Sequence, residues 1–215
     1  MAKLHQGRAN IKVLSFTGPA VKDLIPQIAR LRIEVFPEYP FLYVGDYEYE
    51  MRYLKKFLTM KDAIVVAAFD NDELIGISTG FPFIYEAENL KEVLISDQRN
   101  PDDYFCFGES VLRKSYRGLK IGKIFFEKRE AHVENLHRYR YICFYTIIRP
   151  ANDPKRPSDY RPLAPFWKSR GYTKHPELSG TVSYQEIGET GETPKQMVFW
   201  IKELPKDPRR VDAPI

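Results

Sequence analysis

The sequence predicts one α/β (α+β) domain in which helices flank a sheet, and three patterns lead to that prediction. Residues 63–69 and 74–81 are apolar runs joined by an Asp-Asn-Asp turn, which is typical of a β-hairpin. Residues 141–148 form a continuous apolar run, as in strands covered on both faces. Residues 104–133 change from an apolar run to an amphipathic pattern across a loop, which indicates a strand, a loop and a helix. With 215 residues and 43% hydrophobic content, the chain suits a single compact domain.

The N-terminal part is predicted to contain a strand and two helices. Residues 11–16 alternate apolar and polar side chains with a period of two, which predicts a strand that ends at a Gly-Pro break. Apolar residues between 21 and 36 recur at helical spacing up to Pro37, whose ring stops the helix. After a short loop, residues 47–58 show a second helical pattern.

The remaining elements follow the hairpin. Residues 86–95 form a short helical pattern before the fourth strand. Several prolines fall in residues 149–165, so we expect an ordered loop or a flexible flap there, followed by a short helix around Phe166. Residues 181–187 and 197–204 predict two strands joined by a Gly-rich turn. These elements predict one domain at residues 11–204, with an N-terminal tail at residues 1–10 and a C-terminal tail at residues 205–215.

The loop at residues 117–122 carries the strongest functional signal. Backbone N–H groups in the first turn of a helix have no partners within the helix and lie at the positive end of its dipole, so such a loop can bind phosphate. A Walker loop is disfavoured because Gly118 and Gly122 are one residue too close and Ile124 follows Lys123. The dinucleotide fingerprint G-x-G-x-x-G is also absent. The loop therefore predicts a different phosphate-bearing cofactor.

Residues 116–122 resemble the pyrophosphate loop of the GNAT superfamily of N-acetyltransferases, whose pattern is Arg or Gln, two variable residues, Gly, one variable residue, and Gly or Ala. Arg117 and Gly122 match the first and last positions, and Lys120 departs from the middle Gly. A lysine is unfavourable there if the position needs a positive φ, and tolerable if helical geometry has begun. Three further stretches, residues 31–43, 160–172 and 196–204, are similar to the substrate-side helix and loop, the late helix and the last strand of the superfamily.

The resemblance implies a GNAT fold. This is a single mixed, mostly antiparallel sheet of about six to seven strands, splayed between strands four and five to admit the pantetheine arm of acetyl-CoA. Acetyl-CoA is the implied cosubstrate, and no metal is implied. Basic side chains that flank the loop could pair its phosphates, although surface solvation explains each one singly: Arg113, Lys114, Lys120 and Lys123. The implied cofactor-binding residues are Ser110, Val111, Leu112, Arg117, Gly118, Leu119, Lys120, Ile121, Gly122, Lys123, Phe166 and Trp167.

The resemblance also implies an acyltransferase in which a primary amine attacks the acetyl thioester directly while both substrates are bound. An alkyl ammonium with a pKa of ~10.4 must first lose a proton, so a base is needed. Glu109 is the obvious carboxylate on the fourth strand, although the base of the superfamily falls earlier in that strand, and a structural ion pair is the alternative. Trp167 stands where the superfamily often has a tyrosine that protonates the thiolate. Tyr145 or Tyr160 could take that role, unless both are only packed aromatic residues.

For the acceptor, carboxylates and aromatic residues lie together in the loop between the first two helices. That mixture suits a cationic amine, either a small molecule or a protein amino group, and it equally suits a solvated acidic loop over a Tyr-rich core edge. The expected acceptor-binding residues are Glu34, Tyr39, Tyr43 and Asp46.

Composition sets further limits. The 33 basic and 29 acidic residues give a net charge of +4, which is too small to require a nucleic-acid partner. Cys106 and Cys143 fall in apolar runs of a chain without a secretory leader, which favours reduced thiols and a cytoplasmic location. No apolar run approaches the ~20 residues that cross a bilayer, and the histidines lack matching metal ligands. We expect a soluble monomer or homodimer with no membrane or metal partner.

Two other functions fit the same sequence. A non-catalytic acyl-CoA-binding or sensor module with a degenerate GNAT site is suggested by Trp167 and Lys120. An interaction domain that kept only the fold is suggested by the aromatic loop at residues 39–49.

Overall fold

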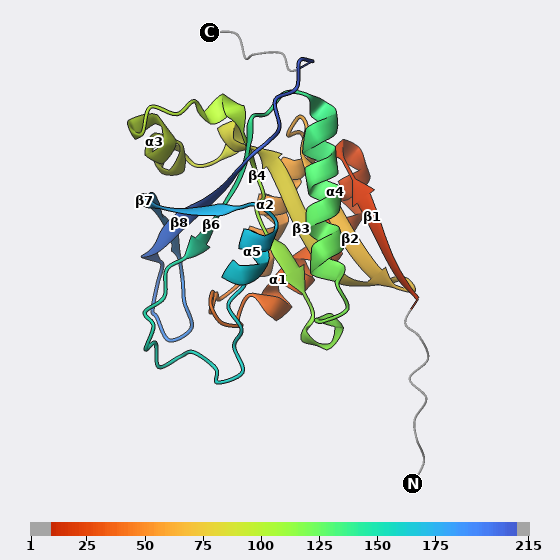
Figure 1. The fold of residues 1–215 in the computed structure, drawn as a ribbon. Helices are drawn as coiled ribbons and strands as arrows, with labels where there is room; N and C mark the ends of the chain where they lie inside the picture. Colours follow the sequence, from red (N-terminus) through yellow and green to blue (C-terminus); the bar gives the residue numbers. More distant parts are fainter. Residues whose placement is uncertain (1–9, 210–215) are drawn as a thin grey trace.

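A single sheet organises the computed structural model, which describes residues 10–209 (Figure 1). Its eight strands lie in the order β1-β2-β3-β4-β6-β8-β7, and β5 pairs with β3 off this path. Strands β4 and β6 are parallel, and the other paired strands are antiparallel. The strands are β1 Ile11–Phe16, β2 Ile64–Asp70, β3 Glu73–Pro82, β4 Tyr104–Cys106, β5 Ser110–Leu112, β6 Tyr141–Ile147, β7 Thr173–Tyr184 and β8 Thr193–Glu203.

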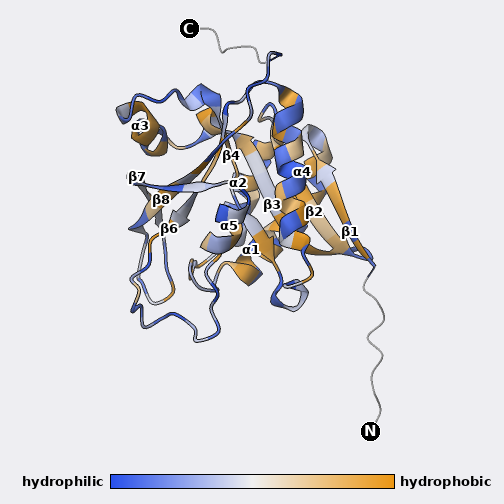
Figure 2. Ribbon diagram, in the orientation of Figure 1, coloured by the Kyte–Doolittle hydropathy of each residue, from blue (hydrophilic) through white to orange (hydrophobic). Residues whose placement is uncertain are grey.

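Helices cover both faces of the sheet. α4 and α5 lie over one face in Figure 1, and α1, α2 and α3 pack against the other. Figure 2 shows that α4 carries both apolar and polar residues along its length, as a helix with one buried side requires. Between residues 10 and 209, no helix has the length and apolar composition that a membrane span needs. The helices are α1 Ile25–Val35, α2 Tyr47–Lys55, α3 Glu88–Ser96, α4 Ile121–Leu136 and α5 Ala164–Ser169.

Each central strand supplies side chains to two hydrophobic cores. In β2, Val65 and Ala67 face the helices α1 to α3, whereas Ile64, Val66 and Ala68 face α4. Successive side chains of a strand point to opposite faces, so a strand buried on both faces is apolar throughout. This arrangement explains the continuous apolar runs of the predicted hairpin.

The predicted fourth strand is broken in the middle. The main chain leaves regular pairing at residues 107–109, where both Gly108 and Glu109 lie opposite Thr79 of β3. The N–H of Gly108 donates to the Thr79 carbonyl at 3.1 Å, and the N–H of Glu109 donates to the Thr79 hydroxyl at 3.2 Å. Two residues facing one is the geometry of a β-bulge. The break turns seven predicted strands into eight, while the predicted fold class is confirmed.

The sheet splays beyond this break, as the resemblance implied. β4 pairs with β6 only as far as Cys106 and Cys143, and the N–H of Phe107 makes the last bond, to the Cys143 carbonyl at 2.7 Å. After that point β5 pairs only with β3, and β6 pairs only with β8. The facing edges of Ser110–Leu112 and the end of β6 therefore carry backbone groups without a strand partner.

Candidate active site

The loop before α4 presents unpaired backbone donors at the start of a long helix. Gly118 and Lys120 both have positive φ, 84° and 65°, and α4 begins at Ile121. Within residues 10–209, none of the N–H groups from Gly118 to Gly122 donates to another protein atom. The N–H of Lys123 is the first to bond, to the Lys120 carbonyl at 3.0 Å. These donors and the helix dipole form a site suited to an anion.

Lys120 therefore adopts the left-handed backbone conformation, which is unfavourable for residues other than glycine. A non-glycine residue in the left-handed region is less stable by roughly 1–2 kcal/mol, and such strain is concentrated at ligand sites. Two residues later, Gly122 has open space around it, since a Cβ added there would meet no heavy atom within 4 Å. The space beside the unpaired donors is thus free of protein atoms.

The basic residues near the loop are already engaged with carboxylates. Arg117 donates to both carboxylate oxygens of Glu38, at 2.6 and 3.0 Å, and to the Leu112 carbonyl at 3.0 Å through Nε. Arg113 contacts Glu34 and Glu73, Lys114 lies 3.5 Å from Asp159, and Lys123 lies 3.5 Å from Glu127. Lys120 has no ion pair among the residues that the structure describes. An incoming diphosphate would compete with Glu38 for Arg117.

Two aromatic residues of α5 lie against β6 on the same face as α4. The Trp167 ring contacts Phe144 and Trp200, each with ring centroids 5.1 Å apart, and Phe166 packs on Phe126 at 5.3 Å. Both are half-buried. The loop, β5 and α5 thus bring most of the predicted cofactor-binding residues around one side of the splay, whereas the Val111 side chain packs into the core on the α1 to α3 face.

Arg129 lies beneath the strand break and was not predicted as a site residue. Arg129 is 1% exposed, and none of the carboxylates in residues 10–209 pairs with it. Its guanidinium donates to the Thr79 carbonyl at 3.0 Å and to the Ser110 hydroxyl at 3.1 Å. The guanidinium also lies over the Phe107 ring at 4.0 Å. Burial lowers the pKa of Arg129 to about 9, so it stays protonated at neutral pH. Arg129 holds β3 and β5 together across the bulge.

Glu109 points to the opposite face, toward α1. Its Oε2 accepts a hydrogen bond from Nη1 of Arg32, and Nε of Arg32 binds Glu50 of α2. Glu50 is fully buried and Glu109 is nearly so, and each keeps one carboxylate oxygen without a hydrogen bond among the described residues. One guanidinium therefore balances two buried carboxylates, and Glu109 forms the ion pair that was the alternative to its role as a base.

Tyr145 and Tyr160 lie in different surroundings. The Tyr145 hydroxyl donates to Glu86 at 3.1 Å on the α1 to α3 face. Burial of the ring, and next the negative charge of Glu86, raise the pKa of Tyr145 well above the usual value. Tyr160 belongs to the loop after β6, where its ring packs edge-on against Tyr39 at 4.7 Å. Burial and Tyr39 raise the pKa of Tyr160. No local sequence pattern pointed to Glu86 as a site residue, because its partner Tyr145 is 59 residues away along the chain.

The four predicted acceptor-binding residues are dispersed around the α1 to α3 face of the sheet. Glu34 is exposed and paired with Arg113, and Asp46 caps α2 by accepting from the Tyr49 N–H at 2.8 Å. Tyr43 lies near Glu50, and burial and Glu50 raise its pKa. Tyr39 packs on Tyr160 as described. Of these four residues, Tyr43 lies near Arg32 and Glu50. The acceptor role of all four stays a prediction.

Comparison with known proteins rests on structure. The sequence matches no protein-family model and no curated protein. Among solved structures, yncA of Salmonella typhimurium, described as an acetyltransferase and solved with acetyl-CoA, has a TM-score of 0.58 at 7% identity over 92% of this chain and 96% of that chain. The ribosomal-protein-alanine N-acetyltransferase of Brucella melitensis gives 0.56 at 14% identity, over 89% and 99%. NAA60 of Arabidopsis thaliana, solved with a bisubstrate analogue, gives 0.55 at 15% identity, over 89% and 98%. The chain has the GNAT acetyltransferase fold.

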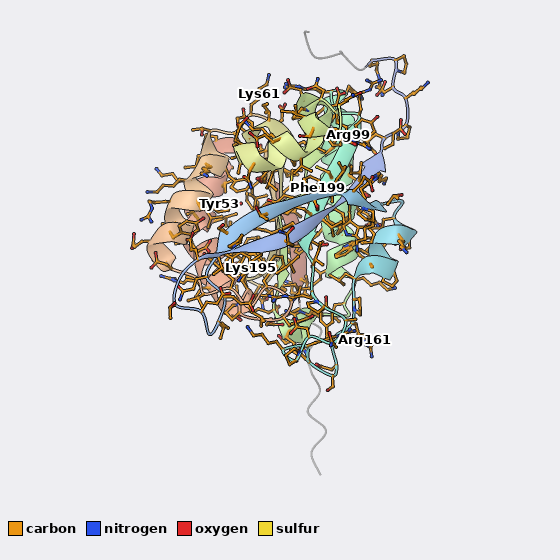
Figure 3. The ribbon with its side chains drawn as sticks, turned by 90° about the vertical axis from the view of Figure 1, so that its left-hand side faces the viewer. Tyr53, Lys61, Arg99, Arg161, Lys195 and Phe199 are labelled. Atoms are coloured by element: carbon orange, nitrogen blue, oxygen red, sulfur yellow. The ribbon has the colours of Figure 1, made fainter. Side chains whose placement is uncertain are left out.

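In this GNAT fold, hydrogen bonds and ion pairs hold the long loop after β6 against the α1–α2 connection. Arg149 donates to the Pro40 carbonyl at 2.8 Å and to Glu186 at 2.8 Å, and Lys155 binds Glu186 at 2.6 Å. Figure 3 labels Tyr53 of α2 on the side toward the strands β7 and β8, and Arg161 in the loop after β6. These hydrogen bonds and ion pairs order the loop and hold it against both the α1–α2 connection and the end of β7.

Asp46 allows a test of its structural role. Asp46→Ala is expected to lower the free energy of unfolding by about 1 kcal/mol, because the Tyr49 N–H loses its cap. Urea denaturation measures the change, with the exposed Asp23→Ala as a matched control. An unchanged unfolding free energy would show that the cap contributes nothing.

Proposed function

We propose that this chain is an acetyl-CoA-dependent N-acetyltransferase that transfers the acetyl group to a primary amine by direct attack in a ternary complex. The observation that carries the proposal is the set of unpaired N–H groups from Gly118 to Gly122, next to the open edges of β5 and β6. The similar structure of yncA, solved with acetyl-CoA, supports this cosubstrate. The similar structure of NAA60, solved with a bisubstrate analogue, supports a ternary complex.

The residues present fit the coenzyme on one face of the splay. The N–H groups of the loop, with Arg117, Lys120 and Lys123, would hold its phosphates, and the edge of Ser110–Leu112 would align its pantetheine amides. Phe166 and Trp167 would line the same side. When bound, acetyl-CoA supplies an acetyl group activated as a thioester. The enzyme contributes chiefly by positioning, which can remove roughly 7–11 kcal/mol from the barrier.

The buried thiols favour direct attack over a covalent acetyl-enzyme. Cys106 is fully buried, and burial and Cys143 raise the pKa of its thiol well above the usual value. A thiol that stays protonated is a poor nucleophile. Both described cysteines are free, which supports the proposed cytoplasmic location. Of the catalytic candidates, Glu109 is held by Arg32, while Tyr145 stays available beside Glu86.

The acceptor is proposed to be a small-molecule amine or a protein amino group. The Brucella protein acts on an alanine of a ribosomal protein, as its name states, and its fold is similar to this one. The competing function is a coenzyme-binding module without turnover, which the presence of Trp167 at the position of the usual tyrosine favours.

Binding and turnover can be separated in one experiment. Acetyl-CoA at about 100 times its Kd is expected to raise Tm by roughly 5–10 °C, whereas ATP and NAD leave Tm unchanged. Release of free thiol is then measured with small amines, polyamines and peptides that carry a free N-terminus. Thermal stabilisation without thiol release would support the non-catalytic module, and no stabilisation would exclude coenzyme binding.

A further inference from the structure

A carboxylate and a tyrosine meet on the acceptor side of the splay, away from the predicted base. Glu86 follows β3, and Tyr145 lies in the part of β6 that has no partner on the β5 side. The Tyr145 hydroxyl donates to Oε1 of Glu86 at 3.1 Å, and the N–H of Ala87 donates to Oε2 at 3.1 Å. This face is opposite to α4 and the phosphate loop, so an amine could approach without crossing the coenzyme side.

Three of the four groups that face the Glu86 carboxyl group are neutral, and the fourth, Lys56, does not form an ion pair with it. Tyr145 of β6, Tyr53 of α2, Cys106 of β4 and Lys56 after α2 face it. Glu86 forms no ion pair among the described residues, and Lys56 is turned over the Tyr53 ring at 5.4 Å. Burial raises the pKa of Glu86 above its ordinary value, against the opposing hydrogen bonds from Ala87 and Tyr145.

Glu109 differs from Glu86 in this respect. Its carboxylate is bound by the Arg32 guanidinium, which also holds Glu50. A proton on Glu109 would break a buried ion pair, so proton transfer to Glu109 is opposed. Glu86 can take up a proton without such a loss. Glu86 and Glu109 thus have different chemical roles.

We propose that Glu86 is the general base for the acceptor amine and that it acts through the Tyr145 hydroxyl. This inference rests on the proposed acetyltransferase function. The ammonium passes one proton to Tyr145 Oη while the Tyr145 proton moves to Glu86 Oε1, which leaves a neutral amine. The nitrogen lone pair then forms the N–C bond as the C–S bond breaks, and the sulfur keeps that electron pair. The second nitrogen proton goes to the thiolate, and Glu86 releases its proton to solvent.

The chemistry requires a base of this kind. An alkyl ammonium has a pKa of ~10.4, so a carboxylate with a raised pKa accepts its proton more readily than an ordinary surface carboxylate. Tyr145 gives that proton a short path from the open edge of β6 to a partly buried group. The acceptor class is therefore a primary amine that arrives protonated, in keeping with the acidic and aromatic character of this face.

Glu86→Gln tests the inference, because glutamine preserves the hydrogen bond from Tyr145 but cannot take up a proton. The value of kcat at pH 7 is expected to fall about 100-fold, with Tm and the Kd of acetyl-CoA unchanged. The rate of the variant should then rise tenfold per pH unit, because only amine that is already neutral reacts. Tyr145→Phe should give a similar loss, and the double variant should lose little more. Glu88→Gln, an exposed residue of α3, is the matched control.

The outcomes distinguish this inference from the proposed function. Turnover by the wild type, with equal kcat and pH profile for Glu86→Gln, would overturn the role of Glu86 and leave the acetyltransferase proposal standing. Absence of turnover by the wild type on every amine would overturn both. A loss in Glu109→Gln but not in Glu86→Gln would assign the base to Glu109.

Discussion

Arg32→Met is expected to lower the free energy of unfolding by about 3–5 kcal/mol at pH 7, because it leaves two buried carboxylates without their cation. Arg32 is 8% exposed at its side chain and joins Glu50 of α2 to Glu109 of the bulge. Methionine keeps an unbranched apolar side chain in place of the arginine stem but removes the guanidinium, which lies over the Phe36 and Tyr53 rings. The loss therefore reports the charge, its hydrogen bonds and its contacts with these rings.

Urea denaturation at pH 7 measures the loss, with the exposed Arg30→Met on the same helix as control. Equal stability of Arg32→Met and wild type at pH 7 would show that the cluster is not held by this ion pair.

Gly122→Val is expected to weaken acetyl-CoA binding about 100-fold, which corresponds to about 2.7 kcal/mol, while the chain stays folded. The added Cβ meets no protein atom within 4 Å, so the fold has room for the side chain. The branched side chain instead fills the space beside the N–H groups of the loop, where a phosphate would have to lie. Isothermal titration calorimetry gives the affinity, and thermal unfolding reports the fold.

Gly191→Val provides the matched control for this substitution. Gly191 also has no heavy atom within 4 Å of an added Cβ, and it lies in the turn between β7 and β8, far along the chain from the loop. Gly191→Val should leave the affinity for acetyl-CoA unchanged. Equal affinity of Gly122→Val and wild type would place the diphosphate elsewhere.

Local patterns were sufficient to predict most elements. The period-two alternation of residues 11–16 and the turn between β2 and β3 predicted those strands where the structure has them. Proline at position 37 correctly predicted the end of the first helix, and α1 stops at Val35. The loop proposed to bind phosphate could be located because unpaired N–H groups at a helix start depend on local sequence alone.

The side-chain contacts on the proposed acceptor side could not be predicted from local patterns. Arg32 and Glu109 are 77 residues apart, and Tyr145 of β6 is 59 residues from Glu86, which follows β3, so only the sheet topology brings these partners together. Arg129 was overlooked because a charged residue in an amphipathic helix usually faces solvent. Gly108 inside an apolar run was a signal for the bulge, since glycine within a strand often marks one.

Isothermal titration of the purified chain with acetyl-CoA is the most direct test of the central claim that the loop before α4 binds the coenzyme diphosphate. We expect one bound molecule per chain, with an affinity that decreases as salt is added because charged groups make the contact. Absence of binding at millimolar acetyl-CoA, or full binding by Gly122→Val, would contradict it.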